Sequence, residues 1–90
     1  MKYLKSFHAS LQNAVDFYAL EDKTVARRFI AAIEDAERKI AAFPKIGKRM
    51  GEFRGFHLQE FPFRYCYKED LDGGLVAVVL FHYKQMGPKI

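Results

Sequence analysis

Two helical patterns follow each other directly near the start of the chain, with only Glu21 and Asp22 between them. Helices joined by so short a turn lie antiparallel, and each must bury one apolar face against another layer of structure. This arrangement excludes an RNA-recognition motif, in which a strand separates the two helices. The rest of the chain must therefore supply the layer on which the helix pair packs.

The spacing of apolar residues defines both helices. From Leu11 to Tyr18 they recur at three- and four-residue intervals, which predicts a first helix of about three turns, capped by Ser10. The second helix is capped by Asp22 or Thr24 and ends at Pro44, because the residue before a proline is pushed out of helical geometry. Its predicted buried stripe consists of Ala26, Phe29, Ile30, Ile33, Ile40 and Phe43.

The remaining apolar residues predict strands. Most of them alternate with polar residues, as in a strand with one buried face, and the others form a continuous apolar run, as in a strand buried on both faces. Strands are expected over residues 2–7, 56–59, 63–68 and 75–83. Pro62 marks a short reversal, and Asp72-Gly73-Gly74 has the composition of a hairpin turn. The stretch Lys45–Arg54, with two glycines, is expected to be a loop.

This order predicts one α+β domain over residues 1–90, with an N-terminal strand and a helix hairpin on a three- to four-stranded antiparallel sheet. Half of the residues are hydrophobic, which is enough for one core. The sequence has no membrane-spanning run and no secretory leader, and its single cysteine, Cys66, allows no internal disulfide. We therefore expect a cytoplasmic protein without a metal or another cofactor.

Positive charge is concentrated in the predicted loop. The chain has 15 Lys and Arg against 11 Asp and Glu, a formal net charge of +4. Lys45, Lys48, Arg49 and Arg54 lie in the loop, together with the single acid Glu52. This concentration suits an anionic partner.

Six short segments, in a particular order, carry a family resemblance. They are Phe7-His8, AVDFY at 14–18, ARRF at 26–29, FPKIG at 43–47, FPFRYCY at 61–67 and VVLFHYK at 78–84. With these segments the chain resembles the RelE/ParE superfamily, the plasmid-stabilisation toxins of bacterial type II toxin–antitoxin systems. The resemblance implies a small curved antiparallel sheet with two helices on one side.

Two mechanisms occur within this superfamily. Members resembling RelE cleave mRNA at the ribosome, whereas members resembling ParE poison DNA gyrase without a comparable nuclease site. RNA cleavage through the 2′-hydroxyl requires a general base, a general acid and cations around the phosphate. The resemblance favours ribosome-associated mRNA cleavage by an mRNA interferase, with a gyrase poison or an inactive antitoxin-binding module as alternatives.

The resemblance also assigns candidate site residues. Arg64, in an Arg-x-x-Tyr pattern, matches an arginine that clamps phosphate, and Lys84 matches a basic residue after the last strand. A pair of lysines is replaced here by Gly55 and His57, so His57 is the candidate base, and His82 is a candidate acid or base. The candidate RNA-binding residues are Lys45, Lys48, Arg49, Arg54 and Tyr83.

Each candidate also has a structural interpretation. Arg64 can be an exposed charge or a partner of Glu60, and His82 can be a hydrogen-bonded histidine of the sheet. Cys66, between two tyrosines, is expected to be a packing residue. The basic residues of the loop can be solvated charges.

The end of the chain departs from the pattern of the nuclease members. Residues 85–90 contain no aromatic residue, so a stacking tyrosine must be Tyr83 or Tyr65, or is absent. The resemblance further implies an acidic antitoxin, encoded by a neighbouring gene, whose disordered segment folds over Arg64 and the Lys45–Arg54 region.

Overall fold

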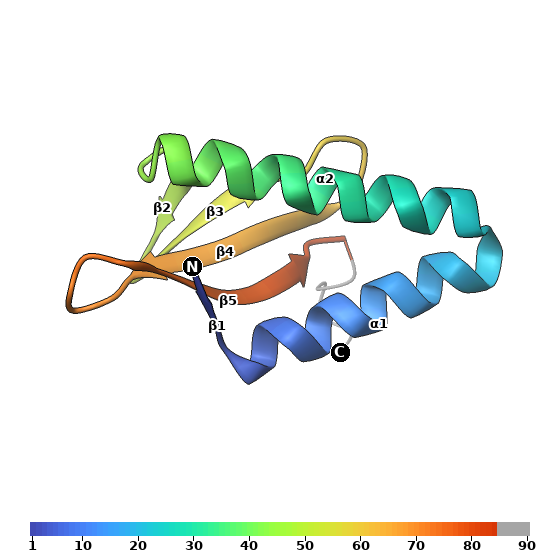
Figure 1. Cartoon of the computed structure of the whole chain (residues 1–90), viewed down its shortest axis with the longest axis horizontal. Coiled ribbons are helices and arrows are strands. Elements are labelled where there is room, and N and C mark those ends of the chain that lie inside the picture. The colour runs from blue at the N-terminus through green and yellow to red at the C-terminus, as the bar shows by residue number, and fades with distance from the viewer. Residues whose placement is uncertain (85–90) are drawn as a thin grey trace.

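A computed structural model describes residues 1–84 and shows two helices packed on a five-stranded sheet (Figure 1). The elements are β1 (Lys2–Tyr3), α1 (Lys5–Glu21), α2 (Lys23–Ala42), β2 (Lys48–Met50), β3 (Phe53–His57), β4 (Phe63–Glu69) and β5 (Leu75–His82). The α+β fold predicted from the sequence is confirmed. Neither helix in this part of the chain is long and apolar enough to span a membrane.

The sheet has more strands than the three or four predicted, and one of its pairs is parallel. Its order is β1-β5-β4-β3-β2, with β1 parallel to β5 and the other pairs antiparallel. The predicted loop Lys45–Arg54 contains β2 and the start of β3, joined by a turn in which Gly51 has a φ of 67°. This positive φ suits glycine and allows the chain to reverse within two residues.

The start of α1 differs from the prediction. Only Lys2 and Tyr3 form a strand, and the helix begins at Lys5, so Ser10 lies within it and is not its cap. The Ser10 hydroxyl donates to the Phe7 carbonyl and accepts from the Leu80 amide, each at 2.9 Å. Ser10 therefore joins α1 to β5.

The cap of α2 agrees with the sequence, and its buried stripe agrees in part. The Asp22 carboxylate accepts a hydrogen bond from the Thr24 amide at 2.8 Å. The buried residues of α2 are Ala26, Phe29, Ile33, Ala36 and Ile40. Ile30 and Phe43 are 41% and 67% exposed, so their predicted burial is wrong. Ile30 lies to one side of the stripe, and Phe43 follows the last helical residue.

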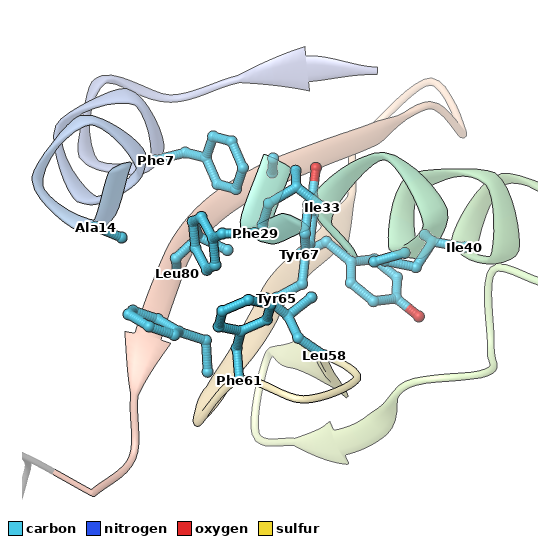
Figure 2. Close-up of a cluster of buried hydrophobic side chains, with 13 residues drawn as sticks. Phe7, Ala14, Phe29, Ile33, Ile40, Leu58, Phe61, Tyr65, Tyr67 and Leu80 are labelled. Atoms are coloured by element: carbon cyan, nitrogen blue, oxygen red, sulfur yellow. The ribbon is translucent and has the colours of Figure 1, made fainter. Parts of the chain in front are cut away.

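Aromatic rings fill the core between the helices and the sheet (Figure 2). Phe7 of α1 and Phe29 of α2 are fully buried, as are Tyr65 and Tyr67 of β4. The ring of Phe29 lies 5.1 Å from that of Phe61, edge to face, and Phe7 lies 5.0 Å from Tyr65. Alternate residues of β4 thus form the floor of the core.

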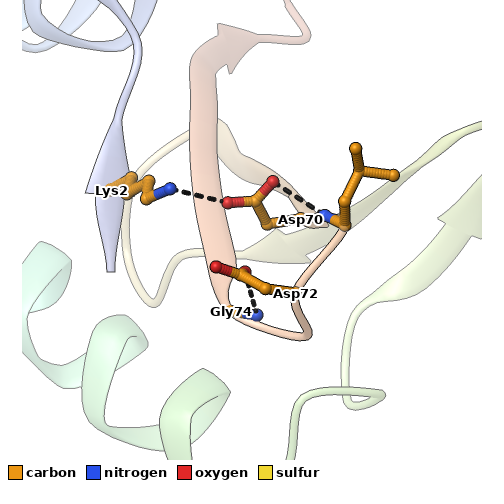
Figure 3. Close-up of polar contacts among 5 residues, drawn as sticks. Lys2, Asp70, Asp72 and Gly74 are labelled. Carbon is orange, nitrogen blue, oxygen red and sulfur yellow. Dashed lines mark hydrogen bonds and ion pairs between the residues drawn. The ribbon is translucent and has the colours of Figure 1, made fainter.

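The predicted hairpin turn between β4 and β5 is present and is tied to the N-terminal strand (Figure 3). Gly73 has a φ of 88°, and the Asp72 carboxylate accepts from the Gly74 amide at 3.3 Å. The Asp70 carboxylate accepts from the Leu71 amide at 2.7 Å and pairs with Lys2 Nζ at 2.8 Å. The hydrogen bond from Lys2, followed by that from Leu71, lowers the pKa of Asp70.

The turn between α2 and β2 is held by one buried hydroxyl. Tyr67 Oη donates to the Pro44 carbonyl at 2.7 Å and accepts from the Gly47 amide at 3.0 Å. A Cβ on Gly47 would lie 2.8 Å from that hydroxyl, so a side chain at position 47 would displace it. Glycine is therefore required for the turn to sit this close to β4.

Replacing Asp70 by Asn should lower the free energy of unfolding at neutral pH. Because the pKa of Asp70 is lower in the folded state, its contribution is present above the ordinary value of 3.8 and disappears as the pH falls further. Urea denaturation of both proteins over a range of pH should show a difference that shrinks on acidification. Lys2→Gln should behave in the same way, and a difference independent of pH would contradict the assignment.

Replacing Tyr67 by Phe should lower the free energy of unfolding by about 1–3 kcal/mol, because the buried Gly47 amide and Pro44 carbonyl lose their partner. Tyr3→Phe is the matched control, since Tyr3 is 40% exposed and water can replace its hydroxyl. Its effect should stay below about 0.5 kcal/mol. Equal losses in the two variants, measured by urea denaturation, would contradict a special role for Tyr67.

Candidate functional site

The sheet divides the predicted catalytic residues between its two faces. His57 of β3 lies directly opposite Arg64 of β4, and His82 of β5 lies opposite Phe63. Phe63 belongs to the core, and consecutive residues of a strand point to opposite faces. Arg64 and His57 therefore lie on the face away from the core, here called the open face, and His82 lies on the core face.

Three of the predicted residues form one cluster on the open face. Arg64 Nε donates to His57 Nε2 at 2.9 Å, and the His57 ring stacks on Tyr83 with centroids 5.1 Å apart and planes 11° from parallel. The Arg64 guanidinium carbon lies 5.3 Å from the centre of the Tyr83 ring, a cation–π distance. The Tyr83 amide donates to the Pro62 carbonyl at 3.2 Å, which fixes the end of β5. We call Arg64, His57 and Tyr83 the arginine cluster.

The hydrogen bond within the cluster determines which nitrogen of His57 carries the proton. Nε2 accepts from Arg64, so it is unprotonated, and the proton of the neutral ring is on Nδ1. Neither nitrogen then has a lone pair available to take a proton from a 2′-hydroxyl. In this arrangement His57 orients Arg64 and is not poised as a general base.

Two neighbours shape the space around Arg64. Gly55 is buried beside it, and a Cβ at this position would lie 2.6 Å from Met50 Sδ and 3.4 Å from Arg64 Cδ. The place where the resemblance expects a lysine is thus filled by Met50 and the stem of Arg64. Lys48 adds a second cation, because it lines the same hollow of about 330 Å³ as His57 and Arg64.

The other predicted catalytic residues lie apart from the cluster. The His82 ring meets Phe63 edge to face at 4.7 Å and lines a groove beside α1. Lys84 is exposed and, within residues 1–84, makes no polar contact with the cluster. The prediction about the tail concerns residues 85–90 and lies outside the described residues.

The structure also tests the structural roles that the sequence suggests for Arg64 and Cys66. Glu60 pairs with Arg28, at 3.6 Å, and the partner of Arg64 is His57. Burial raises the pKa of the Cys66 thiol, and the Arg64 charge opposes that rise only in part. The thiol stays protonated at neutral pH, which agrees with a packing role.

The remaining predicted RNA-binding residues meet at a second site. Lys45, Arg49 and Arg54 line a pocket of about 440 Å³ between the end of α2 and the β2–β3 hairpin. We call it the basic pocket; its other lining residues are Pro44, Glu52, Phe53, Tyr67, Lys68 and Glu69. Sequence reasoning missed Phe53 and Lys68. Gly51 between apolar Met50 and Phe53 is a hairpin signal that would have brought Phe53 into this site.

No group of three or more histidine, cysteine or acidic side chains that could hold a metal ion occurs within residues 1–84. The two sites are built mainly from cationic side chains and aromatic rings. Both features suit the binding of anions and of planar groups.

Comparisons with known proteins give a family and a fold. A family model described as "ParE toxin of type II toxin-antitoxin system, parDE" matches residues 1–86. Among solved structures, the chain is similar to one from the "Chromosomal ParDE TA system from P. aeruginosa", with a TM-score of 0.74 and 14% identity. The similarity covers 89% of this chain and 90% of the other, and at this identity it shows a shared fold. No curated protein sequence matches the chain.

The hydrogen bond from Arg64 should hold His57 in the Nδ1-protonated form when the ring is neutral. Nitrogen NMR of the neutral histidine rings should show Nε2 unprotonated at His57. Arg64→Met should shift His57 toward the Nε2-protonated form, whereas the control Arg27→Met should leave it unchanged. An Nε2-protonated His57 in the parent protein would contradict the cluster geometry.

Proposed function

Because the chain belongs to the ParE toxin family of type II toxin–antitoxin systems, we propose that it is the toxin of such a pair and inhibits growth by binding DNA gyrase. Superfamily members that resemble ParE act in this way without a nuclease site. The observation that carries the proposal is the division of the candidate acid–base residues between the two faces of the sheet.

RNA cleavage through the 2′-hydroxyl needs a base and an acid on opposite sides of one phosphate, each within hydrogen-bond reach. In this chain the sheet lies between His82 and His57. His82 shares the core face with Phe63, whereas His57 lies on the open face. His57, in turn, uses its Nε2 lone pair for Arg64. The open face offers a guanidinium stacked on a tyrosine, which supports binding better than proton transfer.

A second candidate is mRNA cleavage at the ribosome, and the arginine cluster is the observation that favours it. The Nη groups of Arg64 are available to a phosphate, Lys48 lies on the same hollow, and Tyr83 offers a ring for base stacking. Cleavage by this route requires Arg64 to release His57 first, so that the imidazole regains a lone pair.

A toxin of this family is paired with an antitoxin, and the charges of this chain support one surface for it. We propose that an acidic segment of the antitoxin, encoded by a neighbouring gene, folds over Arg64 and the basic pocket. The net charge of +4 supports this assignment, as does β2, which lies at an edge of the sheet.

Expression without the antitoxin should stop DNA synthesis before protein synthesis, with gyrase-linked DNA breaks and an SOS response. Arg64→Ala should abolish growth inhibition and cost the fold about 0.5 kcal/mol or less, since its side chain lies on the open face. His57→Gln and His82→Gln should remain toxic, because neither histidine transfers a proton in this proposal and the Gln carbonyl at position 57 can still accept the hydrogen bond from Arg64. Separate pulse-labelling of DNA and protein measures the order of events.

Arg27→Ala is the control for loss of one positive charge at an exposed position, and it should remain toxic. Early loss of protein synthesis, abolished by either histidine variant, would contradict gyrase binding in favour of mRNA cleavage. Unimpaired growth on expression of the parent protein would contradict both gyrase binding and mRNA cleavage. The remaining alternative would then be an inactive module that binds the antitoxin.

A further inference from the structure

We propose that the basic pocket is a binding site for a nucleotide unit, with the phosphate on Arg49 and Arg54 and the base against Phe53. This site lies apart from the arginine cluster and does not depend on whether gyrase or the ribosome is the target. The argument rests on three properties of the pocket: fixed guanidinium groups, an excess of positive charge and an accessible aromatic wall.

Both arginines are held by main-chain carbonyl groups and keep donors for a ligand. Arg54 Nη1 donates to the Gly47 carbonyl at 2.9 Å and more weakly to that of Lys45 at 3.4 Å. Arg49 Nε donates to the Gly51 carbonyl at 2.8 Å. Within residues 1–84, Nε and Nη2 of Arg54 and both Nη groups of Arg49 have no hydrogen-bond partner. Such donors match the oxygens of a phosphate.

The turn that precedes β2 fixes the position of Arg54. Gly47 is clamped on one side by the Tyr67 hydroxyl, and a Cβ on this glycine would lie 3.2 Å from Arg54 Cβ. The half-buried stem of Arg54 and the carbonyl of Gly47 therefore hold the guanidinium in place before a ligand arrives. A group fixed in advance loses little conformational entropy on binding.

The protein neutralises the positive charge of the pocket only in part. The ion pairs among the described residues lie elsewhere, between Lys2 and Asp70, Arg28 and Glu60, and Asp35 and its two neighbours on α2. Four cations line the pocket, against the two carboxylates Glu52 and Glu69, and none of them forms an ion pair there. An anionic ligand would supply the missing charge.

The aromatic wall favours a nucleotide over a carboxylate side chain. Phe53 is 36% exposed at the pocket, which leaves its ring accessible to a planar group. The volume of about 440 Å³ lies in the range of small-ligand sites and exceeds what one phosphate or carboxylate fills. Glu52 and Glu69 are acceptors for the amino groups of a base, a contact that a carboxylate side chain cannot make.

Calorimetry and amide NMR on the purified full chain test this site with four probes: inorganic phosphate, a nucleoside monophosphate, a short single-stranded oligonucleotide and a glutamate-rich peptide. The monophosphate should bind about tenfold more tightly than phosphate, because stacking adds to the ionic contact. Shifts should be largest at the amides of Gly47, Gly51 and Arg54. Tighter binding of the oligonucleotide than of the monophosphate would indicate that the natural ligand is part of a nucleic-acid strand. Equal binding of the two would indicate that it is a free nucleotide.

Variants separate the two halves of the site. Arg49→Gln should weaken phosphate and monophosphate alike, by about tenfold. Phe53→Leu should weaken binding of the monophosphate and leave binding of phosphate unchanged. Phe53→Tyr keeps an aromatic ring and should bind the monophosphate as tightly as the parent protein does. The control Arg27→Gln, an exposed arginine on α2, should change either affinity by less than about twofold.

Two results would overturn the proposal. The first is the absence of shifts at the pocket with any phosphate probe. The second is a glutamate-rich peptide that binds as tightly as the monophosphate, with affinities that Phe53→Leu does not change. That result would make the pocket a site for an acidic protein segment. Amide spectra of the variants that match the parent protein show that each variant is folded.

Discussion

The hydroxyl of Tyr67 determines how the chain passes from the helices to the strands that carry both sites. It bridges the Pro44 carbonyl and the Gly47 amide, so the end of α2 is attached to the middle of β4. The β2–β3 hairpin follows directly from this turn, and with it the positions of Lys48, Arg54 and His57. A buried hydroxyl with two partners is costly to remove, because both partners would be left without a hydrogen bond.

A second polar contact, partly buried, connects the N-terminal strand to the helices and the sheet. Tyr65 Oη donates to the Glu37 carboxylate at 2.6 Å, and Tyr3 Oη donates to the same oxygen at 2.9 Å. Burial, together with the hydrogen bond to Glu37, raises the pKa of Tyr65 far above its ordinary value. The contact joins β1, α2 and β4. Both tyrosines of β4 therefore combine an aromatic body in the core with a hydroxyl that holds a neighbouring element.

Strand β4 also explains why two candidate sites coexist on so small a protein. Its alternate residues Phe63, Tyr65 and Tyr67 face the core, and Arg64 points the other way, toward the arginine cluster. The basic pocket forms where β4 ends beside the α2–β2 turn. The predicted group of catalytic and RNA-binding residues is thus divided among the arginine cluster, the basic pocket and the core face, where His82 lies, and Lys84 lies apart from all three.

Local order was readable from the sequence because it depends on neighbours along the chain. The period of α2, its cap at Asp22, the hairpin turn at residues 72–74 and the alternation in β4 all follow from residues a few positions apart. The same periodicity gives no account of β2, because a strand of 3 residues is too short to show an alternation and its turn glycine fits a loop equally well. The family resemblance likewise came from the order of short segments, and it is confirmed at the level of the family.

Tertiary structure decided which residues meet, because strand register and the ends of strands depend on contacts across the sheet. A shift in register at Cys66 and Tyr67 is part of how β5 pairs with β4, and this pairing places His82 opposite Phe63. Arg64 could equally have met Glu60, which is near in sequence, but the β3–β4 pairing brings it to His57. Sequence alone thus determined the residue types available for function, and only the packed sheet determined their grouping.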